Sequence, residues 1–324
     1  MKFLKLFVFI LFFSNSQAQV SNLLLKKTVI SDFSGYPIYE YLTEVKEGKT
    51  VWKEKYAYID SIDVYSITYV SDGLKINGLL VKPKANGKYP AIIYNRGGNR
   101  DFGKLVMASG LLTLGKIANE GYVLIASQYR GNAGGEGKEE FGGIEINDII
   151  ILKDVLNEIE EADTERIGMY GWSRGGMMTY ITLTKTNNIK AAVVGGAPSN
   201  LLGLIKDRPE METNVLAELI PNYEENKEIE LHNRSAIMWA DKFPKNVPIL
   251  MLHGNSDWRV KPQESLNMAL EFEKYRVPYR LVMYDGGDHG ISEHREEVNE
   301  QIIRWFDKYL KNDAPVPNME YHGR

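Results

Sequence analysis

The chain has 324 residues, of which 44% are hydrophobic and 25% charged, and it contains no cysteine. These are ordinary values for a globular protein with a sizeable core, and the lack of thiols excludes disulfides, thiolate-bound zinc and a cysteine nucleophile. The formal net charge of -4 gives no reason to expect nucleic acid or an anionic membrane surface as a partner.

The first residues are typical of a secretory signal peptide. Lys2 and Lys5 precede an apolar run over residues 6–13, and small or polar residues follow up to Ala18. The apolar run is shorter than the roughly 20 residues of a membrane-spanning helix, which favours a cleaved signal over residues 1–18 rather than an uncleaved anchor. We therefore expect a secreted or periplasmic protein without stable membrane insertion.

The rest of the chain divides into an extension and one large domain. Residues 19–60 are polar and rich in Tyr and Lys, and we expect them to form an N-terminal extension packed on the domain edge. The domain over residues 61–324 begins with a hairpin whose turn contains Asp72-Gly73. Apolar strands then alternate with helices, so the sequence predicts an α/β fold with a mostly parallel sheet covered on both faces. The expected strands cover residues 91–94, 122–126, 165–170, 191–194, 248–252 and 279–283, and the expected helices residues 105–120, 144–160, 176–183, 263–275 and 293–310.

One segment interrupts this alternation. Residues 201–234 lie between two expected strands and contain Pro209, Pro221 and an acidic run. A connection of this length is unusual inside a compact domain. We expect it to form a cap insertion over the active site.

A candidate nucleophile lies between an expected strand and an expected helix. The pentapeptide Gly171-Trp172-Ser173-Arg174-Gly175 has the Gly-x-Ser-x-Gly pattern of a nucleophile elbow. In so tight a turn the two glycines avoid a clash of Cβ atoms, and the serine hydroxyl projects above the sheet. The pattern predicts Ser173 as the nucleophile.

A serine hydroxyl needs a base to accept its proton, and the base needs a carboxylate that fixes its tautomer. In this arrangement the acid and then the base follow the nucleophile along the chain, each after a later strand. We predict Asp257 as the acid and His289, in a Gly-rich loop, as the base. Asp285 and Asp288 remain alternatives for the acid. The other histidines are expected at structural or surface positions, namely His232, His253, His294 and His322.

An oxyanion hole needs two donors aimed at the developing negative charge. One is the main-chain N–H of Arg174, at the start of the helix after the nucleophile. The second is expected from the Gly-rich loop over residues 95–100, where the sequence leaves Arg96 and Gly97 as equal candidates.

Nothing in the sequence predicts a cofactor or a metal. The Gly-rich stretch over residues 130–137 lacks the Gly-Lys-Ser/Thr of a P-loop and the spacing of a dinucleotide fingerprint, so we interpret it as a surface loop. No spacing of metal ligands is found. The expected partner is a small peptide or ester substrate, and the oligomeric state is left open.

Three motifs together resemble the catalytic domain of the prolyl oligopeptidase family of serine peptidases. They are residues 171–176, the stretch from His253 to Val260, and Asp288-His289-Gly290. Tyr129-Arg130-Gly131 and Phe141-Gly142-Gly143 are similar to the loop that precedes the elbow in that family. The similarity covers roughly residues 60–312 and implies an α/β-hydrolase fold with a triad of Ser173, Asp257 and His289.

Two departures from that family affect the expected activity. Arg96 replaces the usual His or Tyr of the oxyanion loop, and residues 19–60 cannot build the large β-propeller of full-length members. Propeller-free relatives include esterases, and a fold does not determine a substrate. We predict an exported serine hydrolase that cleaves a peptide or aminoacyl amide through an acyl-enzyme on Ser173. A carboxylesterase on the same triad is the alternative, and a non-catalytic binding protein on this scaffold is a third possibility.

Overall fold

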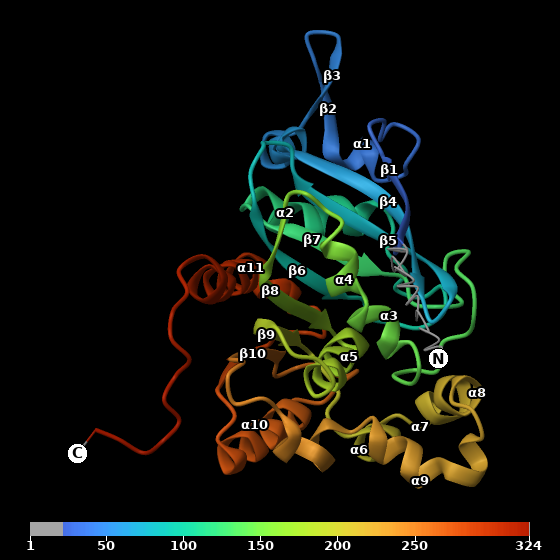
Figure 1. Cartoon of the computed structure of the whole chain (residues 1–324), viewed down its shortest axis with the longest axis vertical. Helices are drawn as coiled ribbons and strands as arrows, with labels where there is room; N and C mark the ends of the chain where they lie inside the picture. Colours follow the sequence, from blue (N-terminus) through green and yellow to red (C-terminus); the bar gives the residue numbers. More distant parts are fainter. Residues whose placement is uncertain (1–21, 324) are drawn as a thin grey trace, which may run out of the picture.

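A nine-stranded sheet forms the centre of the molecule, in the order β1-β4-β5-β7-β6-β8-β9-β10-β11 (Figure 1). The computed structural model describes residues 22–323, so the predicted signal peptide lies outside the described residues. All pairs from β7 to β11 are parallel, and the pairs β1–β4, β4–β5 and β5–β7 are antiparallel. The strands are β1 (Leu24–Val29), β4 (Ile62–Ser71), β5 (Leu74–Pro83), β6 (Tyr89–Asn95), β7 (Val123–Ser127), β8 (Ala162–Trp172), β9 (Ile189–Gly195), β10 (Ile249–Gly254) and β11 (Tyr279–Tyr284).

Helices cover both faces of this sheet, as an α/β-hydrolase fold requires. Neighbouring residues of a strand face opposite sides, so Ile92 belongs to one buried cluster and Ile93 to the other. The cluster that contains Ile92 packs under α2 and α11, and the cluster that contains Ile93 packs under α3, α4, α5 and α10. These helices are α2 (Gly115–Asn119), α3 (Ile146–Ile150), α4 (Leu152–Leu156), α5 (Arg174–Leu183), α10 (Gln263–Tyr275) and α11 (Arg295–Phe306).

The strand pattern predicted from the sequence is confirmed, and several of the expected helices differ in detail. The hairpin β4–β5 turns at Asp72 and Gly73, which have φ angles of 50° and 78°. The helix expected over residues 105–120 contains a π-helical segment, η2 (Ser109–Leu114), before α2. There the N–H of Gly115 reaches back five residues to the carbonyl of Gly110, which widens the turn. The helix expected over residues 144–160 is divided into α3 and α4.

The described part of the N-terminal extension joins the main sheet. Its strand β1 pairs antiparallel with β4 and becomes the edge strand. The extension also forms a hairpin that projects from the molecule (Figure 1) and a 3-10 helix that contacts α2. Its remaining elements are α1 (Tyr39–Leu42), β2 (Thr43–Lys46), β3 (Lys49–Trp52) and η1 (Glu54–Ser61).

Residues 201–234 form a group of short helices at one end of the molecule (Figure 1). They follow β9, which lies beside the strand that carries the nucleophile elbow. Their helices are α6 (Leu201–Asp207), α7 (Pro209–Met211), η3 (Glu212–Leu216), α8 (Ala217–Leu219) and α9 (Tyr223–Asn233), followed by η4 (Ala236–Lys242); near the C-terminus lie η5 (Ser292–His294) and η6 (Asp307–Lys311). Within residues 22–323, no helix combines the length and apolarity needed to cross a membrane.

Candidate active site

Ser173 lies in the sharp turn between β8 and α5, with φ 56° and ψ -128°. A non-glycine residue rarely adopts a positive φ, so this backbone is strained, as expected for a nucleophile elbow. A Cβ atom on Gly171 would overlap the carbonyl of Gly175, and one on Gly175 would overlap the carbonyl of Asn95. Both glycines of the motif are therefore required sterically, as the sequence predicted.

His289 and Asp257 form a hydrogen-bonded pair, although they are far apart in the sequence. Nδ1 of His289 lies 2.7 Å from Oδ2 of Asp257, whose side chain is fully buried. The other carboxylate oxygen, Oδ1, accepts the main-chain N–H groups of Arg259 at 2.8 Å and of Val260 at 3.0 Å. Because β10 and β11 are parallel neighbours, the loops after them bring acid and base together.

The environment of Asp257 keeps it ionised. Burial raises the pKa of this carboxyl, but hydrogen bonds from His253, from His289 and from the N–H of Val260 outweigh burial and lower the pKa well below its usual range. His253 is itself fully buried, with Nδ1 2.6 Å from Oγ of Ser265 and Nε2 2.9 Å from the carbonyl of Val260. His253 therefore supports the acid rather than serving as a second base.

The two alternative acids have other roles. Oδ1 of Asp288 accepts the N–H groups of Gly290 and Ser292, both at 2.9 Å, and thereby holds the loop that carries His289. Asp285 is exposed, and its main-chain carbonyl accepts Nε2 of His294 at 2.9 Å. Within residues 22–323, Asp257 is the only one of the three carboxylates that is hydrogen-bonded to the His289 ring.

The loop over residues 95–100 places Gly97 beside the nucleophile. A Cβ atom on Gly97 would lie 2.9 Å from the carbonyl of Trp172 and 3.4 Å from Cβ of Ser173. The Arg96 guanidinium is buried and donates to the carbonyls of Gln128, Gly97, Arg100 and Phe102, at 3.0–3.4 Å. The Arg96 side chain thus shapes the loop, and the closeness of Gly97 to Ser173 favours its main-chain N–H over that of Arg96 as the partner of the Arg174 N–H.

The Arg174 side chain ties the elbow to the same loop. Its guanidinium is buried and pairs with Glu139 and, at 2.6 Å, with Glu145. It also donates to the carbonyl of Gly98 at 2.9 Å, while Glu139 accepts the N–H of Arg100 at 2.5 Å. Both sides of the candidate oxyanion hole are therefore held by one buried ion-pair network.

Two further contacts with His289 were not predicted. Nε1 of Trp172 donates to the His289 carbonyl at 2.8 Å. Gly196 has a φ of 48°, and a Cβ atom there would lie 3.3 Å from the imidazole. Trp172 occupies a variable position of the elbow pattern and Gly196 belongs to no motif, so the sequence contains no signal for either contact.

A pocket of about 250 Å³ opens next to the elbow, and both Ser173 and His289 line it. The segment over residues 201–234 contributes Leu204, Arg208 and Met211 to its wall. This segment therefore forms part of the wall of the candidate site, and its role as a cap stays a prediction.

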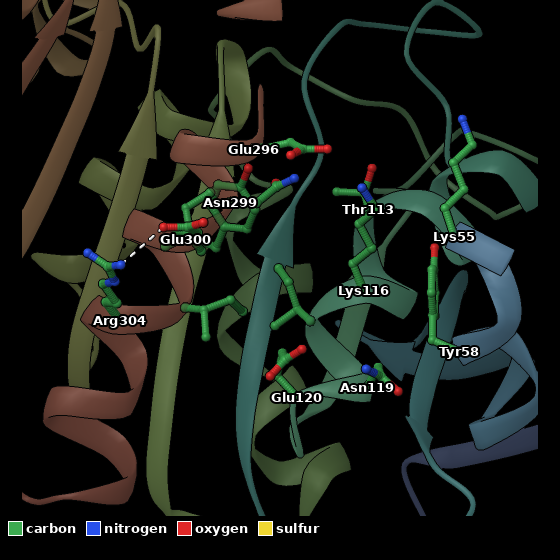
Figure 2. A pocket seen from close by; sticks show the side chains of 14 residues that line it. Lys55, Tyr58, Thr113, Lys116, Asn119, Glu120, Glu296, Asn299, Glu300 and Arg304 are labelled. Atoms are coloured by element: carbon green, nitrogen blue, oxygen red, sulfur yellow. Dashed lines mark hydrogen bonds and ion pairs between the residues drawn. The ribbon is translucent and has the colours of Figure 1, made fainter. Parts of the chain in front are cut away.

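A larger hollow of about 450 Å³ lies between α2 and α11 (Figure 2). Its rim carries Lys116 on one helix and Glu296, Glu300 and Arg304 on the other, and the latter two form an ion pair. None of Ser173, Asp257 and His289 lines it. The candidate chemistry thus belongs to the smaller pocket.

Comparisons with known proteins identify the family. The sequence profile described as Prolyl oligopeptidase family matches residues 112–313. The chain belongs to the prolyl oligopeptidase family. Since this is a family of serine peptidases, the chain is a serine hydrolase, and the resemblance drawn from the three sequence motifs is confirmed.

Relatives of very different length share this domain. An uncharacterized peptidase of Bacillus subtilis, YtmA, is 28% identical over 255 residues, which cover 78% of this chain and 94% of that protein. Human dipeptidyl peptidase 8 is 26% identical over 236 residues, but these cover 68% of this chain and only 25% of that protein. The chain thus spans most of one relative and about a quarter of the other.

Solved structures confirm the α/β-hydrolase fold. The acylaminoacyl peptidase of Pyrococcus horikoshii superposes with a TM-score of 0.68 at 22% identity, over 85% of this chain and 47% of that one. An acetyl xylan esterase from Paenibacillus sp. R4 superposes with a TM-score of 0.60 at 20% identity, over 76% and 84% of the two chains. At these identities the likeness concerns the fold alone, which peptidases and esterases share.

Proposed function

We propose that the protein is an exported serine hydrolase that cleaves a peptide or aminoacyl amide through an acyl-enzyme on Ser173. One observation carries this proposal: His289 is hydrogen-bonded to the buried carboxylate of Asp257 and lines the same small pocket as the strained Ser173. The printed names of the peptidase relatives support an amide substrate.

In the proposed first step, Oγ of Ser173 attacks the acyl carbon while Nε2 of His289 accepts the hydroxyl proton. Asp257 is hydrogen-bonded to Nδ1 of His289. It thereby fixes the tautomer in which Nε2 is free to accept a proton, and it stabilises the imidazolium that forms. The N–H groups of Arg174 and Gly97 hold the negative oxygen of the tetrahedral intermediate. The first N–H groups of a helix have no partner within the helix, so that of Arg174 is available.

The intermediate then collapses in two balanced stages. The bond to the leaving amine breaks as His289 returns its proton to the amine nitrogen, which leaves an ester on Ser173. A water molecule next attacks this ester while His289 accepts a proton from the water. The carboxylic acid product is released as His289 returns the proton to Oγ of Ser173. The enzyme is thus regenerated with no net change in its protonation.

A fluorophosphonate probe tests the nucleophile directly. The wild-type protein should be labelled covalently, and Ser173→Ala should not be labelled. An unlabelled but folded wild-type protein would contradict the proposal and favour a non-catalytic binding role.

The choice between amide and ester substrates needs a substrate panel. Aminoacyl amides, short peptides and acyl esters should be compared by kcat/KM, with Ser173→Ala as the blank. We expect turnover of at least one amide class. Hydrolysis confined to esters would replace the peptidase assignment by the carboxylesterase, which uses the same residues.

Export is the second part of the proposal and rests on residues 1–18 alone. A basic start, an apolar run of eight residues and a small residue at position 18 support cleavage after Ala18. N-terminal sequencing of the protein recovered from a secreting bacterial host should start at Gln19. A mature protein that still begins at Met1 would contradict export by this signal.

A further inference from the structure

The pocket beside Ser173 contains a cation without a counter-ion. The Arg259 guanidinium lies 5.4 Å from the ring centre of Trp258 and 5.9 Å from that of Phe102. Within residues 22–323, no hydrogen bond or ion pair is found for this guanidinium. Arg174, which also lines the pocket, is by contrast neutralised by two buried carboxylates. Arg259 is thus the cation of this pocket that is available to a ligand.

A second guanidinium is held on the same indole ring. Arg208, at the junction of α6 and α7, lies 5.3 Å from the centre of the Trp258 ring. Its Nε pairs with Glu210 at 3.0 Å, and its Nη1 donates to the carbonyl of Arg259 at 3.1 Å. Nη2 of Arg208 has no partner within residues 22–323. The segment over residues 201–234 therefore places a second, partly free guanidinium beside that of Arg259.

The ionised side chains that line the pocket are all arginines, although Arg174 and Arg208 have carboxylate partners outside the lining. Of the described residues that line it, three are arginines, and none is an aspartate or a glutamate. Trp258 is 65% exposed, and Arg208 and Arg259, whose guanidiniums lie near its ring, are half-buried, so this cluster is accessible from the solvent. A planar guanidinium fork matches a carboxylate with two parallel hydrogen bonds, and such charge-assisted bonds are roughly twice as strong as neutral ones.

We propose that this pocket selects substrates that carry a carboxylate near the scissile acyl bond, bound by Arg259 with the help of Arg208. The inference deepens the proposed hydrolase function and rests on it. Arg259 follows the acid Asp257 by two residues, and Oδ1 of Asp257 accepts the Arg259 N–H. The carboxylate site is thus attached to the triad by the main chain, which places the substrate's charge at a defined position relative to Ser173.

A matched pair of activated esters tests this selectivity. We would compare the 4-nitrophenyl monoester of succinate, which has a free carboxylate, with the 4-nitrophenyl ester of succinamic acid, its neutral counterpart. The ratio of the two kcat/KM values should favour the anionic ester by about tenfold to a hundredfold in the wild type, once corrected for their uncatalysed rates. A ratio near one in the wild type would overturn the proposal.

Variants then assign the preference to residues. Arg259→Gln and Arg208→Gln should each bring the ratio toward one, with the larger effect at Arg259. Arg259→Lys should keep part of the ratio, because it keeps the charge and loses the fork. The control is Arg304→Gln, at an exposed arginine of the other hollow (Figure 2), which should keep the wild-type ratio.

Different results would overturn the proposed hydrolase activity and the proposed selection of a carboxylate. Fluorophosphonate labelling and hydrolysis of both esters without a preference would leave the hydrolase intact and overturn carboxylate selection. Equal loss of activity toward both esters in Arg259→Gln would also overturn it, because a guanidinium that binds only a neutral carbonyl would give that result. Absence of labelling and of turnover would overturn both.

Discussion

The sequence predicts Asp257 as the acid, with Asp285 and Asp288 as alternatives, and in the structure Asp257 has three kinds of contact. It receives a hydrogen bond from His289, two from main-chain N–H groups, and lies 3.4 Å from Nε2 of the buried His253. Asp288 holds only its own loop. Substitution of Asp257 should therefore affect catalysis far more than substitution of Asp288.

We expect Asp257→Asn to lower kcat by about four orders of magnitude, because the amide stabilises the wrong tautomer of His289. Asp288→Asn serves as the matched control and should retain most of the wild-type rate. The measurement is kcat on the best substrate of the panel, with circular dichroism to show that both variants fold. A greater loss in Asp288→Asn than in Asp257→Asn would reverse the assignment of the acid.

The lowered pKa of Asp257 predicts an effect of acid on stability. A carboxyl whose pKa is lower in the folded than in the unfolded state stabilises the fold above its unfolded pKa of about 4 and loses this contribution as the pH falls toward the folded value. The free energy of unfolding should thus decrease more steeply below about pH 4 in the wild type than in Asp257→Asn. Urea unfolding of both proteins between pH 3 and pH 7 measures the difference, and parallel curves would contradict the prediction.

Among the loops, the buried network of Arg174 and Glu139 connects the elbow with the oxyanion loop. Burial raises the pKa of Glu139, but the nearby Arg174 charge and its hydrogen bond lower it overall, so the network is ionised. Removing one member of the network leaves a buried charge with fewer partners, which lowers the stability of the folded state. We expect the network to fix the positions of the Gly97 and Arg174 N–H groups relative to Ser173.

Glu139→Gln should therefore lower kcat by about tenfold or more while changing KM little, since the oxyanion forms only after substrate binding. Steady-state kinetics separate the two constants. Glu136→Gln is a suitable control, because Glu136 lies in the preceding loop and accepts the Lys75 N–H instead. If Glu139→Gln raised KM and left kcat unchanged, a role in positioning the oxyanion donors would be wrong.

The packing of α11 and the segment after it on β8 depends on Gly168. A Cβ atom there would lie 2.6 Å from Cε1 of Phe306 and 2.9 Å from Cδ1 of Leu310. Gly168→Ala should lower the free energy of unfolding by about 1–3 kcal/mol through overpacking. Gly110→Ala, whose nearest neighbour would be Cγ1 of Val64 at 3.5 Å, should change it little or raise it by up to about 1 kcal/mol. Urea unfolding midpoints compare the two, and equal effects would refute the packing argument.

Across the fold, the sequence predicted what periodicity and chain order determine. Alternating apolar strands and helices gave the sheet, and the order of motifs brought Ser173, Asp257 and His289 to neighbouring loops. Contacts between distant side chains could not be predicted in this way. The folding of Arg96 into its own loop, the pairing of Arg174 with Glu139 and the stacking of Arg208 on Trp258 depend on rotamers and long-range packing, which leave no local pattern.

The position of β11 has a further consequence for the biosynthesis of the protein. It is the last strand of the described chain, it forms one edge of the sheet, and the loop after it carries His289. Large domains gain structure as the chain leaves the ribosome, N-terminal parts first. On the proposed mechanism, a partly synthesised or partly translocated chain has its nucleophile but no base. Hydrolysis can therefore begin only after the chain has been delivered past His289 and β11 has docked on β10.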